Sequence, residues 1–177
     1  VYVKDACSDP RIQYPEAMRA EGIASVLSVP VIASDKVIGV LRLYSAEPHD
    51  YSDEDVEFVS ALAEMGGMAI VNARIYQDKD EQLASLFEEI GVDLPTTVEA
   101  GRQELSVSAV QDVDPSKSLG YFRTLHEVTS AVLSTLDSQE VVQLIVDKVI
   151  SIMQVKASAL RLRNETTHEL ELIATSG

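Results

Sequence analysis

The chain has 177 residues, of which 46% are hydrophobic, and its 29 Asp and Glu against 14 Lys and Arg give a formal net charge of −15. This charge repels the phosphates of nucleic acids and anionic lipid surfaces, so we expect neither as a partner. The lone cysteine, Cys7, excludes an intrachain disulfide framework and a thiolate zinc site. The chain begins with Val1 and not with a methionine, which indicates a fragment of a longer protein. We expect a cytoplasmic location, which is compatible with a parent protein that is attached to a membrane.

The first elements predicted are a short extended start, a short helix and a β-hairpin. Tyr2 to Lys4 is extended, and a helix follows Pro15 over residues 15–21. Two strands rich in Val and Ile cover residues 25–33 and 37–44, with a turn at Ser34-Asp35-Lys36. The apolar stretch around these strands is too short to span a bilayer.

A long helix is predicted from residue 53 to about residue 90. Ser52 and Asp55 form a capping pattern at its start. Apolar or small residues then recur with a 3-4 spacing that suits packing along a parallel helix. This stripe is the predicted dimer or signalling surface, although up to residue 74 we favour the interpretation that it covers the domain's own sheet. Its residues are Val59, Leu62, Gly66, Ala69, Ala73, Tyr76, Leu83, Phe87 and Ile90.

The second half predicts helices first and a hairpin last. Residues 91–118 are rich in Pro, Gly, Ser and Thr and indicate a linker. An amphipathic helix over 119–136 places Phe122, Leu125, Val128 and Val132 on one side. A second capping pattern at Asp137 begins a helix that ends near Met153. Strands over 157–163 and 169–175 complete a second hairpin. Two hairpins with helices on one face predict an α+β fold with an antiparallel sheet.

The first half resembles the C-terminal part of a GAF domain. The resemblance rests on Val3-Lys4-Asp5 with Asp9-Pro10-Arg11, on the stretches 22–31 and 37–44, and on the helix end at 68–76. Residues 119–177 resemble the N-terminal part of a GAF domain, through the helix 126–136, Asp137-Ser138 and the two final strands. The resemblance implies a GAF-like, profilin-like sheet with helices on one face, in a bacterial-type signalling regulator.

The GAF halves therefore stand in reversed order: 1–91 is a C-terminal half with an extended helix, 92–118 a linker and 119–177 an N-terminal half. One arrangement is an excerpt from a tandem array. The other is one sheet assembled from both halves, within one chain or swapped between two. An isolated hairpin is marginal in water, so we predict that the halves complement each other.

In GAF domains one sheet face meets the helices and the other lines a ligand pocket. Strand alternation puts Gly39, Leu41 and Leu43 on one face, which we assign to the helices. The polar residues on the other face are the candidate ligand-binding residues, since guanidinium groups suit carboxylates and phosphates. The alternative is that they pair with acidic neighbours or face water. The candidates are Ser28, Arg42, Tyr44, Arg161, Arg163 and Glu171.

The predicted function is a non-enzymatic sensory module that binds an unknown small molecule and relays a signal through helices, with a homodimer formed by those helices. No catalytic residue, cofactor or metal site is predicted. Cys7 precedes Ser8 and so lacks the Cys-His pair of bilin-binding members, and one thiol cannot complete a redox relay. The alternative is a structural dimerisation and linker module without a ligand.

Overall fold

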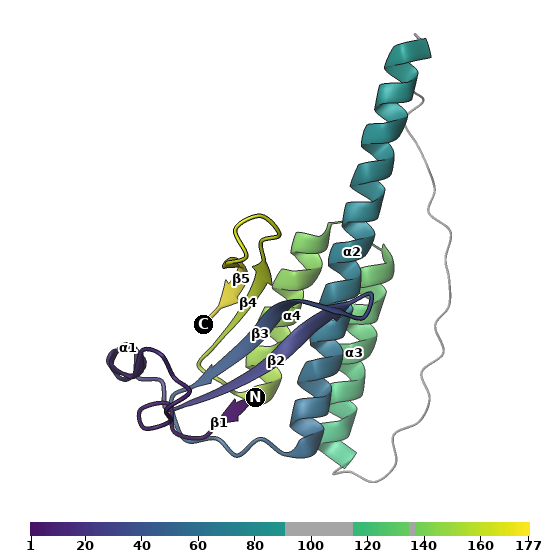
Figure 1. The fold of residues 1–177 in the computed structure, drawn as a ribbon. Coiled ribbons are helices and arrows are strands. Elements are labelled where there is room, and N and C mark those ends of the chain that lie inside the picture. Colours follow the sequence, from purple (N-terminus) through teal and green to yellow (C-terminus); the bar gives the residue numbers. More distant parts are fainter. Residues whose placement is uncertain (91–114, 135–136) are drawn as a thin grey trace.

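The computed structural model describes residues 1–90, 115–134 and 137–177, with side chains described for 1–76, 118–134 and 137–177. Figure 1 shows a single sheet beside a group of helices, one of which projects well past the rest. In chain order the elements are β1 (Tyr2–Val3), α1 (Pro15–Ala20), β2 (Ser25–Ala33), β3 (Lys36–Ser45), α2 (Asp53–Ile90), α3 (Pro115–Ser134), α4 (Ser138–Met153), β4 (Ala157–Arg163) and β5 (Leu170–Ser176).

The sheet is antiparallel throughout, with the strand order β1-β2-β3-β4-β5. At its centre β3 pairs with β4, from Gly39 opposite Leu162 to Tyr44 opposite Ala157. These two strands come from the two segments on either side of 91–114, so one sheet contains strands from both. The β2–β3 turn places Ser34 and Asp35 at positive φ, as tight two-residue hairpins require. The predicted α+β class with helices packed against an antiparallel sheet is confirmed.

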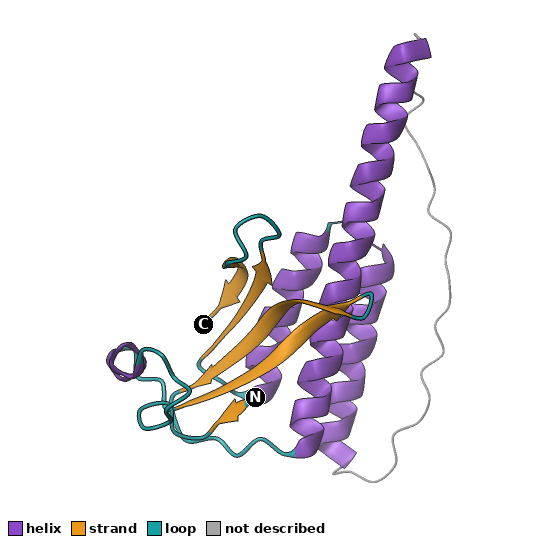
Figure 2. Cartoon of the chain, in the orientation of Figure 1, coloured by secondary structure: helices purple, strands orange, loops and turns teal. Residues whose placement is uncertain are grey.

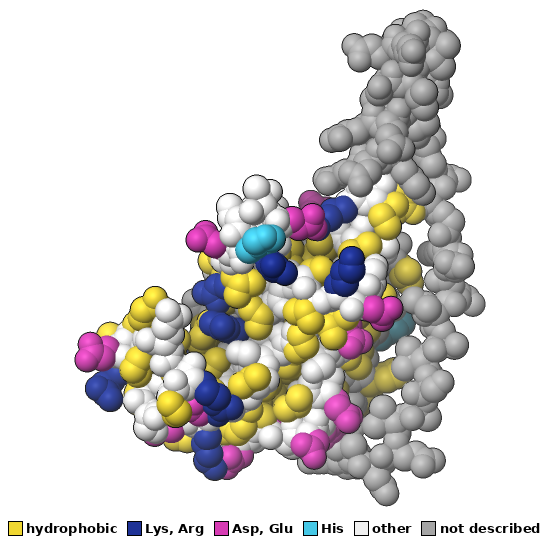
Figure 3. Space-filling view, in the orientation of Figure 1, with side chains coloured by type: hydrophobic (Ala, Val, Ile, Leu, Met, Phe, Trp, Pro, Cys, Tyr) yellow, Lys and Arg dark blue, Asp and Glu magenta, His cyan; other side chains and the backbone are white. Residues whose placement is uncertain are grey.

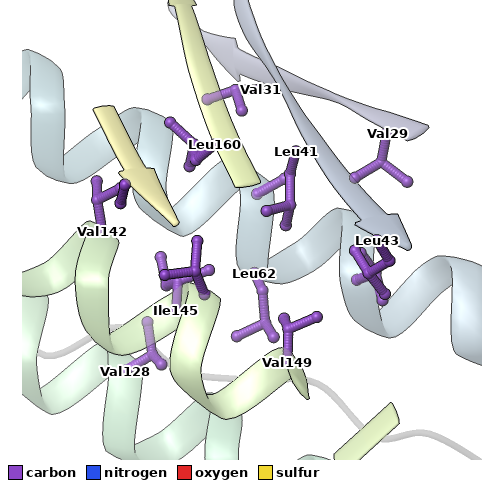
Figure 4. Close-up of a cluster of buried hydrophobic side chains, with 14 of the residues drawn as sticks. Val29, Val31, Leu41, Leu43, Leu62, Val128, Val142, Ile145, Val149 and Leu160 are labelled. Carbon is purple, nitrogen blue, oxygen red and sulfur yellow. The ribbon is translucent and has the colours of Figure 1, made fainter. Parts of the chain in front are cut away.

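Helices cover one face of the sheet in two layers. α2 and α4 lie directly on the strands, and α3 packs against α2 and α4 (Figure 2). The core between them consists of fully buried aliphatic side chains from both segments, among them Leu41 of β3, Leu62 of α2, Ile145 of α4 and Leu160 of β4 (Figure 4). At about 25 cal/mol per Å² of apolar surface, this shared core is the main stabilising contribution to the fold.

α2 begins with a reciprocal cap, because the Ser52 amide donates to Asp55 Oδ2 at 2.9 Å and the Asp55 amide donates to Ser52 Oγ at 3.2 Å. Gly67 lets this helix approach β2 closely, since a Cβ there would lie 2.3 Å from the Ile32 carbonyl oxygen. At the neighbouring Gly66 a Cβ would lie 3.2 Å from Ile145 Cδ1, so both glycines stand at close contacts of α2. Among the described helices, the Asp53–Tyr76 part of α2 is long and apolar enough to cross a membrane, and half of that stretch is buried in the protein.

α3 differs from its predicted boundaries and its predicted face. It begins at Pro115, four residues before Leu119, because proline is well suited to the first turn of a helix. The buried side chains are Tyr121, Thr124 and Val128, whereas Phe122 is 63% exposed. The prediction that Phe122 lies on the buried side was wrong. The neighbouring Tyr121 is buried instead, with its ring stacked on Phe58 at a centroid distance of 4.0 Å, and this rotates α3 so that Phe122 faces outwards.

Two further local predictions have clear outcomes. Asp137 caps α4 as expected, since its Oδ1 accepts from the amides of Gln139 at 2.8 Å and Glu140 at 3.4 Å. Gly39 lies on the face that we assigned to the helices, but its closest neighbour is a strand. A Cβ at Gly39 would meet the Arg161 carbonyl oxygen at 2.3 Å, so this glycine allows close approach of β4.

Candidate functional site

The candidate site lies on the face of the sheet that the helices do not cover. Ser28 of β2 is opposite Arg42 of β3, and Arg42 is opposite Ala159 of β4. One pair further along, Val40 is opposite Arg161. Because side chains alternate along a strand, Arg42 and Arg161 project from adjacent strands on this outer face. In the view of Figure 3, where β2 and β3 lie in front of the helices, Lys and Arg side chains lie among hydrophobic ones.

The two arginines differ in their partners. Arg161 donates from Nη1 to the Tyr44 hydroxyl at 3.0 Å. Arg42 is half-buried, and its Nε is buried without a hydrogen-bond partner. Within the described residues neither guanidinium forms an ion pair with a carboxylate. The predicted alternative of acidic neighbours is therefore wrong for this pair, which leaves two cations close together on a protein of net charge −15.

One end of the outer face is covered by the loop that contains α1. Val3, Ala6 and Ile23 form a small buried cluster with Val26 of β2 and Tyr44 of β3. Tyr44 is therefore only 8% exposed, and its hydroxyl is the part that reaches Arg161. Ser28, Arg42 and Arg161 lie beyond this cover and are all half-buried.

The Asp9-Pro10-Arg11 motif holds this covering loop to the edge of the sheet. Arg11 donates to both oxygens of Asp9, at 2.8 Å and 2.5 Å, and to the Tyr2 carbonyl at 3.1 Å. The hydrogen bonds from Arg11 lower the pKa of the Asp9 carboxyl to about 2. At the same edge the Lys4 ammonium lowers the pKa of Asp50. These charges are paired locally, so the motif has a structural role in this chain.

Arg163 and Glu171 do not join the arginine pair. Arg163 is exposed and contacts His168 Nδ1 at 3.1 Å, at the hairpin end of β4. Glu171 was expected on the outer face, which is wrong. A register shift between Leu160 and Arg161 puts Glu171 opposite Leu162, so its side chain lies on the helix side and accepts from Asn164 at 2.6 Å. The shift brings Leu172 opposite Arg161 instead.

The same shift adds an apolar part to the site that strand alternation could not indicate. Leu170 and Leu172 lie on the outer face and are 47% and 55% exposed. With Pro30 and Val40, they border the arginine pair with hydrophobic surface. A bulge adds one residue to one strand only, and a single sequence gives no clear sign of it.

Most residues of the predicted signalling stripe on α2 pack against other parts of the same chain. Val59, Leu62, Ala69 and Ala73 are buried in the core, and a Cβ at Gly66 would lie 3.2 Å from Ile145 Cδ1. These five positions make intrachain contacts, whereas Tyr76 is 42% exposed. The side chains of the remaining three, Leu83, Phe87 and Ile90, lie outside the described residues.

Two hollows of about 350 Å³ and about 270 Å³ lie between α2, the start of α4 and the β4–β5 hairpin; Leu172 lines the larger, and Arg163 and Glu171 line the smaller. They share Arg74, Leu162 and Ile173, and neither includes Arg42 or Arg161. Arg74 is paired with Glu165 at 3.5 Å, and both side chains are largely exposed. Over the part of the chain that the structure describes, no group of three His, Cys, Asp or Glu side chains could hold a metal ion.

Comparison with known proteins agrees with this fold. The family model described as GAF domain matches residues 1–71. The chain is 32% identical over 69 residues to the circadian input-output histidine kinase CikA of Thermosynechococcus vestitus, a match that covers 38% of this chain and 10% of that protein. The chain thus spans about a tenth of the curated relative that it matches. No solved structure matches. The predicted GAF resemblance is therefore confirmed over residues 1–71.

Proposed function

We propose that this chain is a non-enzymatic sensory module of a signalling protein, and that it binds a small anionic molecule on the outer face of its sheet. The observation that carries the proposal is the pair Arg42 and Arg161 on adjacent strands, without a carboxylate partner among the described residues. GAF domains are typical of signalling proteins, and the family match over residues 1–71 supports this class.

The chemistry of the site favours a ligand with an anionic group and an apolar body. Forked guanidinium donors bind carboxylates and phosphates in two places at once. The buried Nε of Arg42 would gain a partner from such a group, and an unmade hydrogen bond at a buried donor costs about 1–3 kcal/mol. Leu172, exposed and opposite Arg161, offers apolar contact beside the charges.

The route of the signal is through β3 and β2 to α2. Arg42 lies between Leu41 and Leu43, which are fully buried on the helix side of the same strand. α2 in turn packs on β2 at Gly67, with almost no space between backbones. A ligand that favours one position of these strands therefore favours one position of α2. α2 continues as an unbroken helix for 14 residues beyond Tyr76, which is about 21 Å at 1.5 Å per residue. It therefore projects past the rest of the domain (Figure 1).

Calorimetric titration tests the proposal. The 177-residue chain is titrated with a panel of nucleotides and small carboxylates. A compound that binds is then titrated against Arg42→Gln/Arg161→Gln, which is expected to lose at least about tenfold in affinity, and against Arg19→Gln as a matched control on α1. No binding across the panel, or equal binding by the double variant, would contradict an anion site at these arginines.

The second candidate function is a structural dimerisation and linker module with no ligand. The observation that favours it is that neither Arg42 nor Arg161 lines either of the two described hollows. In that case the projecting α2 would connect neighbouring domains without reporting occupancy of the sheet. No response to the ligand panel, together with a stable helix-mediated dimer, would support this second function.

A further inference from the structure

The two hollows beside the β4–β5 hairpin adjoin each other, because Arg74, Leu162 and Ile173 line both. We call the two together the hairpin hollow. It lies at the end of the domain from which α2 projects, and the start of α4 and the β4–β5 turn lie at the same end (Figure 1). Sites for small molecules measure about 300–1,000 Å³. At about 350 Å³, the larger part alone is of that size.

The larger part of the hairpin hollow has a mostly apolar lining. Ile70 and Ala73 of α2 and Val142 of α4 line it from the helices, where they also belong to the buried core. Leu172 of β5 lines it from the sheet and is 55% exposed. A molecule seated here would remove apolar surface of three elements from water, which is favourable in proportion to the area covered. This part of the hollow therefore fits the apolar body of a ligand.

The start of α4 forms one wall of the larger part, through Ser138 and Gln139. Its first turn is already capped, because the amides of Gln139 and Glu140 both donate to Asp137 Oδ1. A ligand therefore cannot use these two amides, and its charge must be matched by side chains. The side chain of Gln139 is exposed at this wall.

The smaller part of the hairpin hollow is lined by charges of both signs. Arg74 and Arg163 are the basic residues, Glu165 and Glu171 are the acidic ones, and all four are exposed. Acidic and basic side chains lie close together at this end of the sheet in Figure 3. A simple anion or cation would meet a like charge here as well as an opposite one. The field of a protein with a net charge of −15 also opposes a free anion.

These charges keep the capacity to bind a ligand. Arg74 is 3.5 Å from Glu165, in an exposed pair of the kind that contributes little to stability. Arg163 contacts the His168 ring at 3.1 Å, which leaves its other guanidinium hydrogens for a carboxylate. Glu171 accepts from Asn164 through one carboxylate oxygen, so its second oxygen can accept from an ammonium group.

We propose that the hairpin hollow binds a zwitterionic amino acid with an apolar side chain. The side chain occupies the larger part, the carboxylate binds Arg74 and Arg163, and the ammonium group binds Glu165 or Glu171. A head group with both charges adds no net charge to an acidic protein and satisfies residues of both signs. This site is separate from the arginine pair on the outer face, and the proposal goes beyond the function proposed above and does not depend on it.

The position of the hollow gives such a ligand a direct effect on α2. Ala73 and Arg74 lie just before Tyr76, where the projecting part of the helix begins. The opposite walls belong to α4 and the β4–β5 hairpin, which come from the other side of residues 91–114. The ligand therefore bridges the two segments of the chain, and its binding should raise Tm in proportion to its affinity and concentration.

The first test compares head groups on one alkyl chain. The 177-residue chain is titrated by calorimetry with L-2-aminooctanoate, octanoate and octylamine. L-2-aminooctanoate is expected to bind at least about tenfold more tightly than either single-charge compound, because each of them lacks one set of charge-assisted hydrogen bonds. L-2-aminobutanoate, which is four methylenes shorter, should bind at least about a hundredfold more weakly, since each buried methylene improves affinity by about fourfold.

The second test locates the ligand. Arg74→Gln should weaken the binding of L-2-aminooctanoate by at least about tenfold. Gln139→Trp should abolish binding, because an indole at this wall fills the larger part of the hollow. Both residues are exposed, so far-UV circular dichroism and Tm without ligand should be retained. Arg123→Gln, which removes an exposed arginine on α3, is the matched control and should bind as the wild type does.

Three results would overturn the proposal. The first is no binding of L-2-aminooctanoate, and the second is octanoate or octylamine binding as tightly as the amino acid. The third is binding that Arg74→Gln and Gln139→Trp leave intact and that Arg42→Gln/Arg161→Gln removes. That last result would place the ligand on the outer face, so it would support the function proposed above while excluding the hairpin hollow as its site.

Discussion

Replacing Gly67 by alanine should separate α2 from the sheet, because the helix touches β2 there through its backbone. A Cβ on Gly67 would lie 2.3 Å from the Ile32 carbonyl oxygen, 3.0 Å from its carbon and 3.3 Å from Val31 Cγ1. The obstacle is main chain within the sheet, which cannot rotate aside as a side chain can. α2 would have to withdraw by about 1 Å from β2 to restore ordinary contact, and so lose packing along the interface.

The magnitude follows from two opposing effects. Overpacking a core costs about 1–3 kcal/mol, and a rigid carbonyl at this distance belongs at the upper end. Alanine in place of glycine within a helix returns about 1 kcal/mol. Gly67→Ala should therefore lose about 2 kcal/mol, which in a chain of this length lowers Tm by about 4–8 °C. Gly120→Ala on α3, where a Cβ meets nothing within 4 Å, should raise Tm by about 2–4 °C.

Thermal unfolding followed by circular dichroism compares the two variants, and urea unfolding gives the free energies of unfolding. Equal stabilisation by both substitutions would refute the close α2–β2 contact, and with it the proposed route from the strands to α2. Gly66→Ala provides an intermediate case, because its Cβ would meet the end of the Ile145 side chain at 3.2 Å. A flexible neighbour can shift by a few tenths of an ångström, so that variant should be close to neutral.

Three more predictions concern the links between parts of the fold. Tyr121→Phe keeps the ring but removes the hydroxyl that donates to buried Asp55, so urea unfolding should show a loss of about 1–3 kcal/mol; no loss would mean that this hydrogen bond contributes nothing. Asp9 has its pKa lowered to about 2, so its contribution to stability is present above its unfolded pKa of about 3.9 and is lost as pH falls towards 2. Arg11→Gln should return that pKa towards 3.9 in a carboxyl NMR titration, and an unchanged pKa would contradict the pairing. The two polypeptides that flank residues 91–114 should each fail to fold alone and regain circular dichroism when mixed; a well-folded monomer of the first alone would refute complementation.

Local sequence signals predicted the elements well where one interaction dominates. The strands β2 and β4 have the predicted bounds, because each is a largely apolar run that ends at a polar turn. The capping pattern at Asp137 also matches the structure, since an N-cap is satisfied within three residues of the chain. Such features depend on neighbours in sequence and need no knowledge of the rest of the fold.

The failures all depend on contacts with distant residues. Glu171 lies on the helix side because β5 has one extra residue opposite β4. Strand alternation in the sequence does not reveal such a bulge. Phe122 was expected in the core in place of Tyr121, because a hydroxyl favours the surface unless a buried partner accepts from it. Asp55, 66 positions away, is that partner. Neither the bulge nor the buried carboxylate could be read from the residues beside them.

The rotation of α3 also decides which of its two aromatic side chains is exposed. If Phe122 were in the core, Tyr121 would turn towards the solvent and leave Asp55. The hydrogen bond between Tyr121 and Asp55 therefore has two consequences: it holds α3 to the start of α2, and it turns Phe122 outwards. Burial of a polar group at one place thus sets which apolar side chain remains on the surface, and the spacing of apolar residues along α3 does not reveal it.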